Sequence, residues 1–222
     1  MKNIDFHAHI LPCCDHGSDS SKTSFSQLTL AREASVDIIC ATPHYYGEKE
    51  NVGSFLERRK VCFERLMEKR KDSLPKILTG AEILAFEGIE RLPDLDKLCL
   101  ENTNILLMEM PFNHWSGKLV DSVGALCESG DYTVVLAHAD RYSSEKVERL
   151  LEYGALIQLN AESLSHIIVK KSLKNYIEWD TVYALGSDIH LLGDGYNHWK
   201  KFRTRHKDLF NRIMENTNSL LF

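Results

Sequence analysis

Short apolar runs alternate with longer amphipathic stretches along the chain, which is the pattern of strands alternating with helices. Seven runs predict strands, at residues 3–7, 36–42, 77–82, 105–110, 132–138, 155–160 and 181–187. Amphipathic stretches predict helices at residues 21–34, 53–71, 115–129, 143–153, 162–176 and 199–216. Alternation of this kind is typical of a parallel sheet, and the uninterrupted apolar run from Val134 to Ala137 suits a sheet covered on both faces. Because no Gly-x-Gly-x-x-Gly segment is present, we expect a closed or nearly closed α/β barrel, as one domain over residues 1–222, rather than a doubly wound sheet.

The composition is that of an ordinary globular enzyme. Of the 222 residues, 43% are apolar and 27% are charged, which excludes a disordered chain. The net charge of -5 is spread along the sequence, and no basic stripe for nucleic acid is visible. The short run Lys69-Arg70-Lys71 falls at the end of a predicted helix, where cations suit the helix dipole.

The chain has no apolar stretch of about 18 residues and no apolar segment near Met1, so we expect neither a membrane span nor a signal peptide. Six cysteines without a disulfide framework fit the reduced cytoplasm. No cysteine is followed by arginine at the spacing Cys-x5-Arg. A phosphatase loop with a cysteine nucleophile is therefore absent.

Each predicted strand ends in a polar side chain, and at six of the seven ends, all but that of Asn160, the side chain can bind metal. Because parallel barrels place their active sites at the carboxyl ends of the strands, these side chains should meet at one rim. The residues are His7, His9, His44, Glu82, Glu109, His138, Asn160, Asp188 and His190, with a further candidate after the first strand at Asp15 or His16. His7 and His9 are two residues apart, as are Asp188 and His190, so each pair faces one side of its strand.

Each of these residues alone is more often structural than functional, since lone histidines are commonly hydrogen-bonded and lone carboxylates commonly cap helices. Together they indicate metal binding, because burying so many imidazoles and carboxylates at one site would be energetically unfavourable without cations. One ion takes about four to six of them. The set therefore predicts two or three divalent ions, with manganese as the first candidate and iron or zinc as the others.

A site of this kind favours hydrolysis. A water shared by two cations loses a proton near neutral pH, and cations neutralise the oxygens of a phosphoryl group during its transfer. Arg141 either clamps a phosphate oxygen with its planar guanidinium or pairs with a neighbour such as Asp140. Four rings near the strand ends either wall a substrate pocket or pack the loops: Tyr45, Tyr46, His114 and Trp115.

The motifs resemble those of the PHP (polymerase and histidinol phosphatase) superfamily, with a paired His-x-His near one end and an Asp-x-His near the other. Within it, the sequence is similar to the bacterial CpsB/YwqE-type protein-tyrosine phosphatases, which regulate capsule and exopolysaccharide synthesis. The matching segments are residues 5–12, 41–44, 80–83, 108–114, 137–138 with Arg141, and 186–190. The Pro-Phe-Asn-His segment at residues 111–114 favours the phosphatase branch.

The resemblance implies a distorted (β/α)7 barrel with three divalent ions at its C-terminal rim. It assigns one ion to His7, His9, Glu82 and Asp188, a second to Glu82, Glu109 and His138, and a third to His44, His190 and His16. It also makes Arg141 a phosphate-binding residue, so the expected catalytic residues are Arg141, Glu82 and Asp188. The family commonly has a second such arginine shortly after Asp-x-His, but residues 191–196 hold none here, and Arg203 is the first available.

The expected function is metal-dependent hydrolysis of phosphotyrosine proteins in capsule biogenesis, in the cytoplasm and without a nucleic-acid partner. Two alternatives remain open: a small-molecule phosphatase of the histidinol-phosphatase type, and a catalytically silent metal-binding regulatory module. A nuclease is disfavoured by the lack of a basic groove. Comparing the turnover of a phosphotyrosine peptide with that of histidinol phosphate separates the two enzymes, and metal binding without turnover identifies the silent module.

Overall fold

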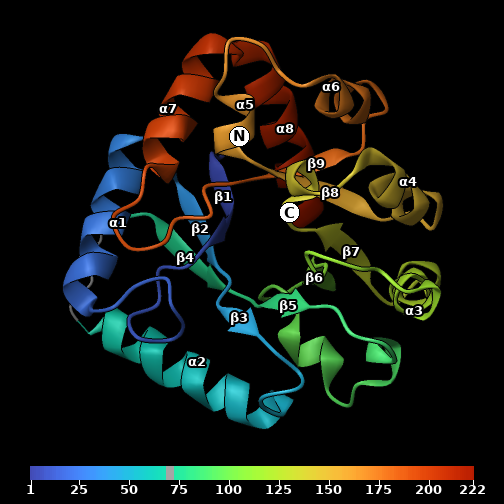
Figure 1. Ribbon diagram of the computed structural model, residues 1–222. Helices are drawn as coiled ribbons and strands as arrows, with labels where there is room; N and C mark the ends of the chain where they lie inside the picture. The colour runs from blue at the N-terminus through green and yellow to red at the C-terminus, as the bar shows by residue number, and fades with distance from the viewer. Residues whose placement is uncertain (69–72) are drawn as a thin grey trace.

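Parallel strands form the centre of the molecule and helices surround them in the computed structural model, which describes residues 1–68 and 73–222 (Figure 1). The strands are β1 (Ile4–Ala8), β2 (Ile38–Ala41), β3 (His44–Tyr45), β4 (Lys76–Thr79), β5 (Glu82–Leu84), β6 (Ile105–Glu109), β7 (Thr133–Leu136), β8 (Leu156–Asn160) and β9 (Val182–Gly186). The α-helices are α1 (Ser21–Glu33), α2 (Val52–Met67), α3 (Gly117–Glu128), α4 (Ser144–Glu152), α5 (Ala161–Leu164), α6 (Lys171–Glu178), α7 (Gly195–Arg205) and α8 (Lys207–Leu221).

Two of the seven predicted strands are each followed by a short second strand that was not predicted as a separate element. The strand predicted at residues 36–42 is β2, and β3 follows it after Pro43, which has no N–H to donate to a ladder. The strand predicted at residues 77–82 is divided into β4 and β5 by Gly80 and Ala81. Pairing continues across both breaks, since the Glu82 N–H donates to the Pro43 carbonyl at 3.1 Å. The strand orders are β1-β2-β4 and β3-β5-β6-β7-β8-β9, and all of these pairs are parallel.

The first and last strands of the chain lie side by side. Just beyond the end of β9, the Asp188 N–H donates to the His7 carbonyl at 2.9 Å, and the His9 N–H donates to the Ile189 carbonyl at 3.3 Å. The buried Asp5 carboxylate accepts the Ser187 N–H at 2.8 Å. These bonds bring residues from the two ends of the sequence to one point of the rim, and the expected distorted α/β barrel is confirmed.

Two predicted helices are wrong as single elements. The helix predicted at residues 162–176 is observed as α5 and α6, and residues 165–170 between them are not helical. The helix predicted at residues 199–216 is observed as α7 and α8, which meet at His206, where φ is -129° and ψ is 52°. The cationic run at residues 69–71 lies outside the described residues.

On β6 and on β8, side chains two residues apart change from apolar to polar toward the carboxyl end of the strand, which places the polar site at one end of the barrel. On β6, Ile105 and Leu107 lie in an apolar cluster, and Glu109, two residues further on, reaches the rim. On β8, Leu156 packs against the same cluster, and Gln158 and Asn160 follow at the same spacing. Among the described residues, no helix is both long and apolar enough to cross a bilayer.

Candidate metal centre

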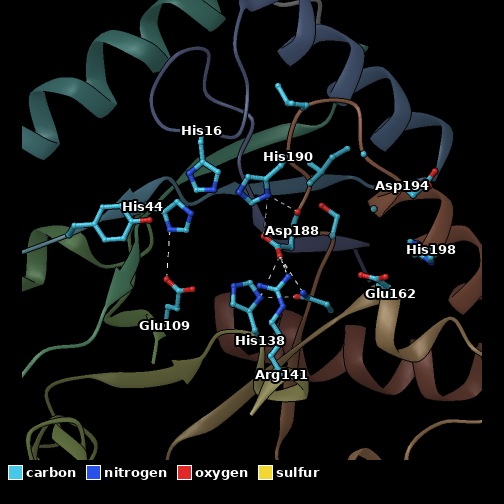
Figure 2. A pocket seen from close by; sticks show the side chains of 17 residues that line it. His16, His44, Glu109, His138, Arg141, Glu162, Asp188, His190, Asp194 and His198 are labelled. Atoms are coloured by element: carbon cyan, nitrogen blue, oxygen red, sulfur yellow. Dashed lines mark hydrogen bonds and ion pairs between the residues drawn. The ribbon is translucent and has the colours of Figure 1, made fainter. Parts of the chain in front are cut away.

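The carboxyl ends of the strands open into a cavity of about 730 Å³ (Figure 2). His16, His44 and Glu109 lie on one side of it, Asp188, His138 and Arg141 lie in the middle, and Glu162, Asp194 and His198 lie on the other side. His198 on the cavity wall was not among the candidate residues that the sequence analysis named. The predicted rim residues are thus brought together from strands that are far apart in sequence.

Glu82 does not line this cavity but is fully buried behind it, in contact with the lining residues His44 and His138. Its Oε2 atom lies 3.2 Å from His7 Nε2, 3.2 Å from His9 Nε2 and 2.9 Å from His44 Nδ1. Its Oε1 atom lies 2.7 Å from His138 Nε2. Burial opposes ionisation of this carboxyl, but the His7 charge and the hydrogen bonds from His138 and His44 lower its pKa well below the ordinary value. Glu82 is therefore an anion surrounded by four imidazoles.

Asp188 completes a second cluster of donor atoms with the two histidines of β1. Its Oδ1 atom lies 3.8 Å from His7 Nε2 and 3.6 Å from His9 Nε2, and these two nitrogens lie 3.0 Å apart. Burial opposes ionisation of Asp188, but His7, His138 and the other nearby cationic groups lower its pKa to about 2. Burial would likewise lower the pKa of His9, yet the hydrogen bonds of Asp15 and Glu82 raise it to about 10. Without a cation, the protonated imidazole of His9 therefore balances the carboxylates.

Four histidines share one orientation, in which Nδ1 is held by an oxygen and Nε2 is directed into the site. The Nδ1 partners are Gln158 Oε1 for His7 (3.1 Å), Asp15 Oδ2 for His9 (2.7 Å), Asn160 Oδ1 for His138 (3.2 Å) and the Asp188 carbonyl for His190 (3.0 Å). An oxygen acceptor fixes the proton on Nδ1 and leaves the Nε2 lone pair free for a cation. This is the arrangement of metal-ligating histidines.

Gln158 on β8 contacts two of the rim histidines, and the sequence analysis missed it. Gln158 Oε1 also accepts the backbone N–H of His138 at 3.0 Å, and Gln158 Nε2 donates to Asn160 Oδ1 at 2.9 Å. Asn160 Nδ2 in turn donates to Asp188 Oδ2 at 3.3 Å. Gly186 makes room for this network, because a Cβ there would lie 2.6 Å from Gln158 Nε2. The available signal was a polar residue two positions before Asn160 in an otherwise apolar strand.

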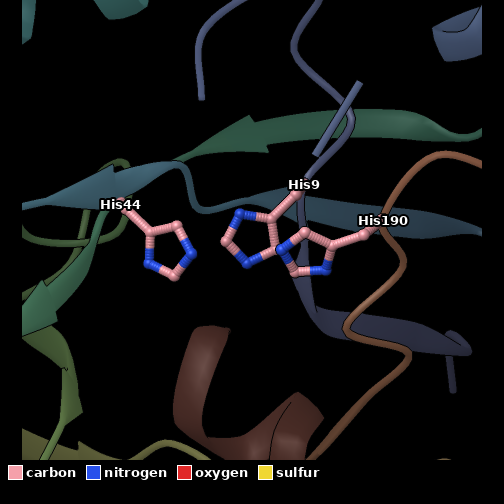
Figure 3. Close-up of side chains that lie close together, drawn as sticks. All are labelled: His9, His44 and His190. Atoms are coloured by element: carbon pink, nitrogen blue, oxygen red, sulfur yellow. The ribbon is translucent and has the colours of Figure 1, made fainter. Parts of the chain in front are cut away.

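A third cluster consists of His9, His44 and His190, from three different parts of the chain (Figure 3). Burial and the nearby charge of His9 lower the pKa of His190 to about 4, so its imidazole is neutral at physiological pH. The ring of His16 lies 4.7 Å from those of His44 and His190, measured between centroids. Asp15 is instead engaged with His9, with the Gly17 N–H at 2.8 Å and with the His44 N–H at 3.1 Å.

The donor atoms group somewhat differently from the sets that the resemblance implied. Glu109 groups with His44 and Glu82, and its Oε2 atom lies 3.9 Å from His44 Nδ1. His138 groups with Glu82 and His7. Burial and the charge of Glu82 raise the pKa of Glu109, as expected for two carboxylates that share a site.

Arg141 contacts Asp188 rather than Asp140. Its Nη2 atom donates to Asp188 Oδ2 at 2.6 Å, and its side chain remains 37% exposed toward the cavity. Asp140 instead accepts the Asn160 N–H at 3.0 Å. Arg203 lies elsewhere, since it donates to the Ala34 carbonyl at 3.3 Å. Among the described residues that line the cavity, Arg141 is thus the one arginine or lysine.

The donor set fits divalent cations. One of its buried atoms, His190 Nε2, has no hydrogen-bond partner, although buried polar atoms normally have one. Four groups of three donor residues have their ligand atoms within 4.8 Å of one another. A mixture of carboxylate oxygens and neutral imidazole nitrogens suits manganese, iron or zinc.

The fold and the donor set together define a class, the metal-binding α/β barrels of the PHP type. Within this class, residues 3–205 match the profile of the family described as capsular polysaccharide synthesis, CpsB/CapC, and the chain belongs to that family. The resemblance drawn from the sequence motifs is therefore confirmed.

A comparison with solved structures gives a similar result. A chain from the crystal structures of YwqE from Bacillus subtilis and CpsB from Streptococcus pneumoniae, which are described as unique metal-dependent tyrosine phosphatases, is 27% identical, with a TM-score of 0.80 over 98% of this chain and 94% of that one. A probable 2-pyrone-4,6-dicarboxylic acid hydrolase from Acinetobacter baumannii, with citric acid bound, is 14% identical, with a TM-score of 0.57 over 99% of each chain, and shares the fold. A search of curated proteins gave no match.

Proposed function

We propose that the chain is a metal-dependent protein-tyrosine phosphatase that acts in capsular or exopolysaccharide synthesis. The observation that carries this proposal is the buried Glu82 carboxylate, which lies within 3.2 Å of nitrogen atoms from His7, His9, His44 and His138. Membership in the CpsB/CapC family and similarity to structures described as metal-dependent tyrosine phosphatases support the same reaction and substrate class.

The ligand sets follow the resemblance, and the donor groups of the structure support the first of them. We assign His7, His9, Glu82 and Asp188 to one cation. The Nε2 atoms of the two histidines lie 3.0 Å apart, and each lies within 3.8 Å of an oxygen of Glu82 and of Asp188. A second cation would use Glu82, Glu109 and His138, and a third would use His44, His190 and His16. We prefer His16 to Asp15 for the third set, because both Asp15 oxygens already accept hydrogen bonds. The cations are divalent, with manganese first among the candidates.

Divalent cations held there would supply an activated water and would neutralise charge on the phosphoryl group. The protein groups bind and orient the ester. Arg141 holds a phosphoryl oxygen through N–H groups that are not used by Asp188, and its planar guanidinium matches the geometry of such oxygens. Glu82 and Asp188 are ionised and would hold the cations, and Gln158 and Asn160 keep the rings of His7 and His138 in place.

The direct test is hydrolysis of p-nitrophenyl phosphate by metal-stripped protein that is titrated with manganese, with a phosphotyrosine peptide assayed beside it. We expect manganese to restore turnover of both substrates. Metal binding without turnover of any phosphoester would contradict the proposed enzymatic activity and would favour the alternative, a catalytically silent regulatory module. Iron and zinc are titrated in parallel to identify the preferred metal.

One observation favours a second candidate, a small-molecule phosphatase of the histidinol-phosphatase type. The cavity wall opposite His44 carries the carboxylates of Glu162 and Asp194, and among the described residues that line the cavity Arg141 is the one lysine or arginine. Such a wall suits a phosphoester that also carries an amino group. Turnover of histidinol phosphate at a higher kcat/KM than that of phosphotyrosine peptides would favour this candidate.

A further inference from the structure

A second cavity of about 570 Å³ adjoins the catalytic cavity. Tyr46 lines both cavities, and its ring stacks on that of His44 with centroids 5.2 Å apart. The Pro-Phe-Asn-His segment, which the sequence analysis singled out, contributes Pro111 and His114 to the second cavity. Neither the metal centre nor Arg141 uses this segment.

On three neighbouring strands, one residue belongs to the metal centre and the residue two positions further along lines the second cavity. His44, Glu82 and Glu109 lie on or at the ends of β3, β5 and β6, which pair in that order. The residue two positions beyond each of these lines the second cavity: Tyr46 after His44, Leu84 after Glu82, and Pro111 after Glu109. Since side chains repeat every two residues on a strand, the second cavity continues the metal centre outward along the same side of these strands.

The walls of the second cavity are suited to an apolar side chain flanked by polar backbone. Leu84, Phe86, Pro111 and Leu119 supply apolar surface, and Glu48 and Glu87 are exposed. Phe86 packs closely against the chain at Gly47, where a Cβ atom would lie 2.6 Å from its ring. This contact fixes one wall of the cavity, so the apolar surface is present before any ligand arrives.

We propose that this cavity binds the polypeptide next to the phosphotyrosine of the substrate, and that it takes up an apolar side chain within about two residues of that phosphotyrosine, a reach set by the length of an extended chain. The inference rests on the proposed function. A phosphoryl group beside Arg141 leaves the rest of the substrate at the mouth of the catalytic cavity, and Tyr46 is the shared wall over which the chain continues. A small ester reaches only the first cavity.

The test compares phosphotyrosine peptides that carry leucine or glycine at the positions flanking the phosphotyrosine. For each metal-loaded protein we measure kcat/KM for the peptide divided by kcat/KM for p-nitrophenyl phosphate. We expect this ratio to be about tenfold higher for the best leucine peptide than for the all-glycine peptide, as the partial burial of one apolar side chain supplies. Equal ratios for all peptides would overturn the inference.

Two matched variants locate the effect. Phe86→Ala removes an apolar wall of the second cavity, and Phe25→Ala removes a similarly half-buried phenylalanine that lines a separate cavity on α1. We expect the leucine preference to fall by about tenfold in Phe86→Ala and to persist in Phe25→Ala. Persistence in both would place the peptide elsewhere and overturn the inference.

A third variant covers the case in which Phe86→Ala does not fold. Glu48→Trp changes an exposed residue of the second cavity and fills part of its space. It should likewise abolish the leucine preference, and an unchanged preference would overturn the inference. The failure of the proposed function is a different result, because the parent protein would then turn over neither p-nitrophenyl phosphate nor the peptides.

Discussion

Arg141 and Asp188 form an ion pair in which Arg141 Nη2 lies 2.6 Å from Asp188 Oδ2. The other oxygen of the same carboxylate faces the Nε2 atoms of His7 and His9. Asp188 therefore connects the residue that we assign to the phosphate with the residues that we assign to a cation. Both Asp188 and His138 have positive φ values, of 50° and 52°, which non-glycine residues rarely adopt and which recur at functional sites.

Replacing Arg141 should reduce catalysis without removing the metals. We expect Arg141→Ala to lower kcat/KM for p-nitrophenyl phosphate by about 10² to 10³, because the variant loses a charged donor to the phosphoryl oxygens. Arg141→Lys should recover only part of this loss, since an ammonium group cannot make two parallel hydrogen bonds. Steady-state kinetics together with metal analysis checks the prediction. Full activity in Arg141→Ala at matched metal content would remove the assigned role.

Replacing His44 or His138 should abolish hydrolysis while the fold remains. Each imidazole contacts Glu82, at 2.9 Å and 2.7 Å respectively, so each alanine variant lacks a donor at the centre of the cluster. Circular dichroism checks the fold, and p-nitrophenyl phosphate hydrolysis checks the activity. His166→Ala is a suitable control, because His166 is exposed and lies outside the donor groups and both cavities. Retained activity in both variants at matched metal content would contradict the proposed site.

Gln158→Leu should weaken metal binding by about tenfold to a hundredfold, although Gln158 belongs to no donor group. The change removes the oxygen that holds His7 Nδ1, so the His7 ring loses its orientation, and it also removes the acceptor of the His138 backbone N–H. Competition between the protein and a chromogenic chelator measures the affinity. An unchanged affinity in a folded variant would mean that the β8 network does not position the ligands.

The metal-free protein should lose stability as the pH rises. Although burial acts against it, hydrogen bonds from Asp15 and Glu82 raise the pKa of His9 from 6.5 to about 10 in the folded state. A raised pKa contributes stability that is fully present below pH 6.5 and is lost as the pH rises toward about 10. Urea unfolding of the metal-free protein at several pH values measures this decline.

The same protonation links the pH to metal affinity. A cation needs the Nε2 lone pair of His9, so binding expels its proton and the apparent affinity should rise with pH up to about 10. Calorimetric titration in two buffers of different ionisation enthalpy counts the released protons. If no proton is released at neutral pH, His9 is not a cation in the metal-free protein.

Thiol reagents should leave hydrolysis intact. Burial raises the pKa of Cys99 to about 11 and that of Cys127 to about 12, so little reactive thiolate is present at neutral pH. Cys13 is exposed in the loop before His16, and Cys13→Ser controls for steric effects of its modification. Activity after iodoacetamide treatment is the measurement. A loss of activity that persists in Cys13→Ser would indicate a required cysteine.

The sequence by itself determined the alternation of strands and helices, the family and the residues of the rim. These features follow from local patterns: the period of apolar residues, and polar side chains placed where an apolar strand ends. The positions of His7, Glu82, His138 and Asp188 at strand ends were therefore readable without coordinates. The splitting of helices at Ile167 and at His206 was not, since amphipathic patterns continue across both points.

Only the tertiary structure decided which donors meet, because contact between distant segments depends on how the barrel closes. It brought β9 beside β1, so that Asp188 reaches His7 and His9. It also joined Arg141 to Asp188 instead of Asp140, and it gave Gln158 its contacts with two histidines. A polar residue in a strand shows in the sequence, but its partners are fixed by the stagger of neighbouring strands, which no local pattern encodes.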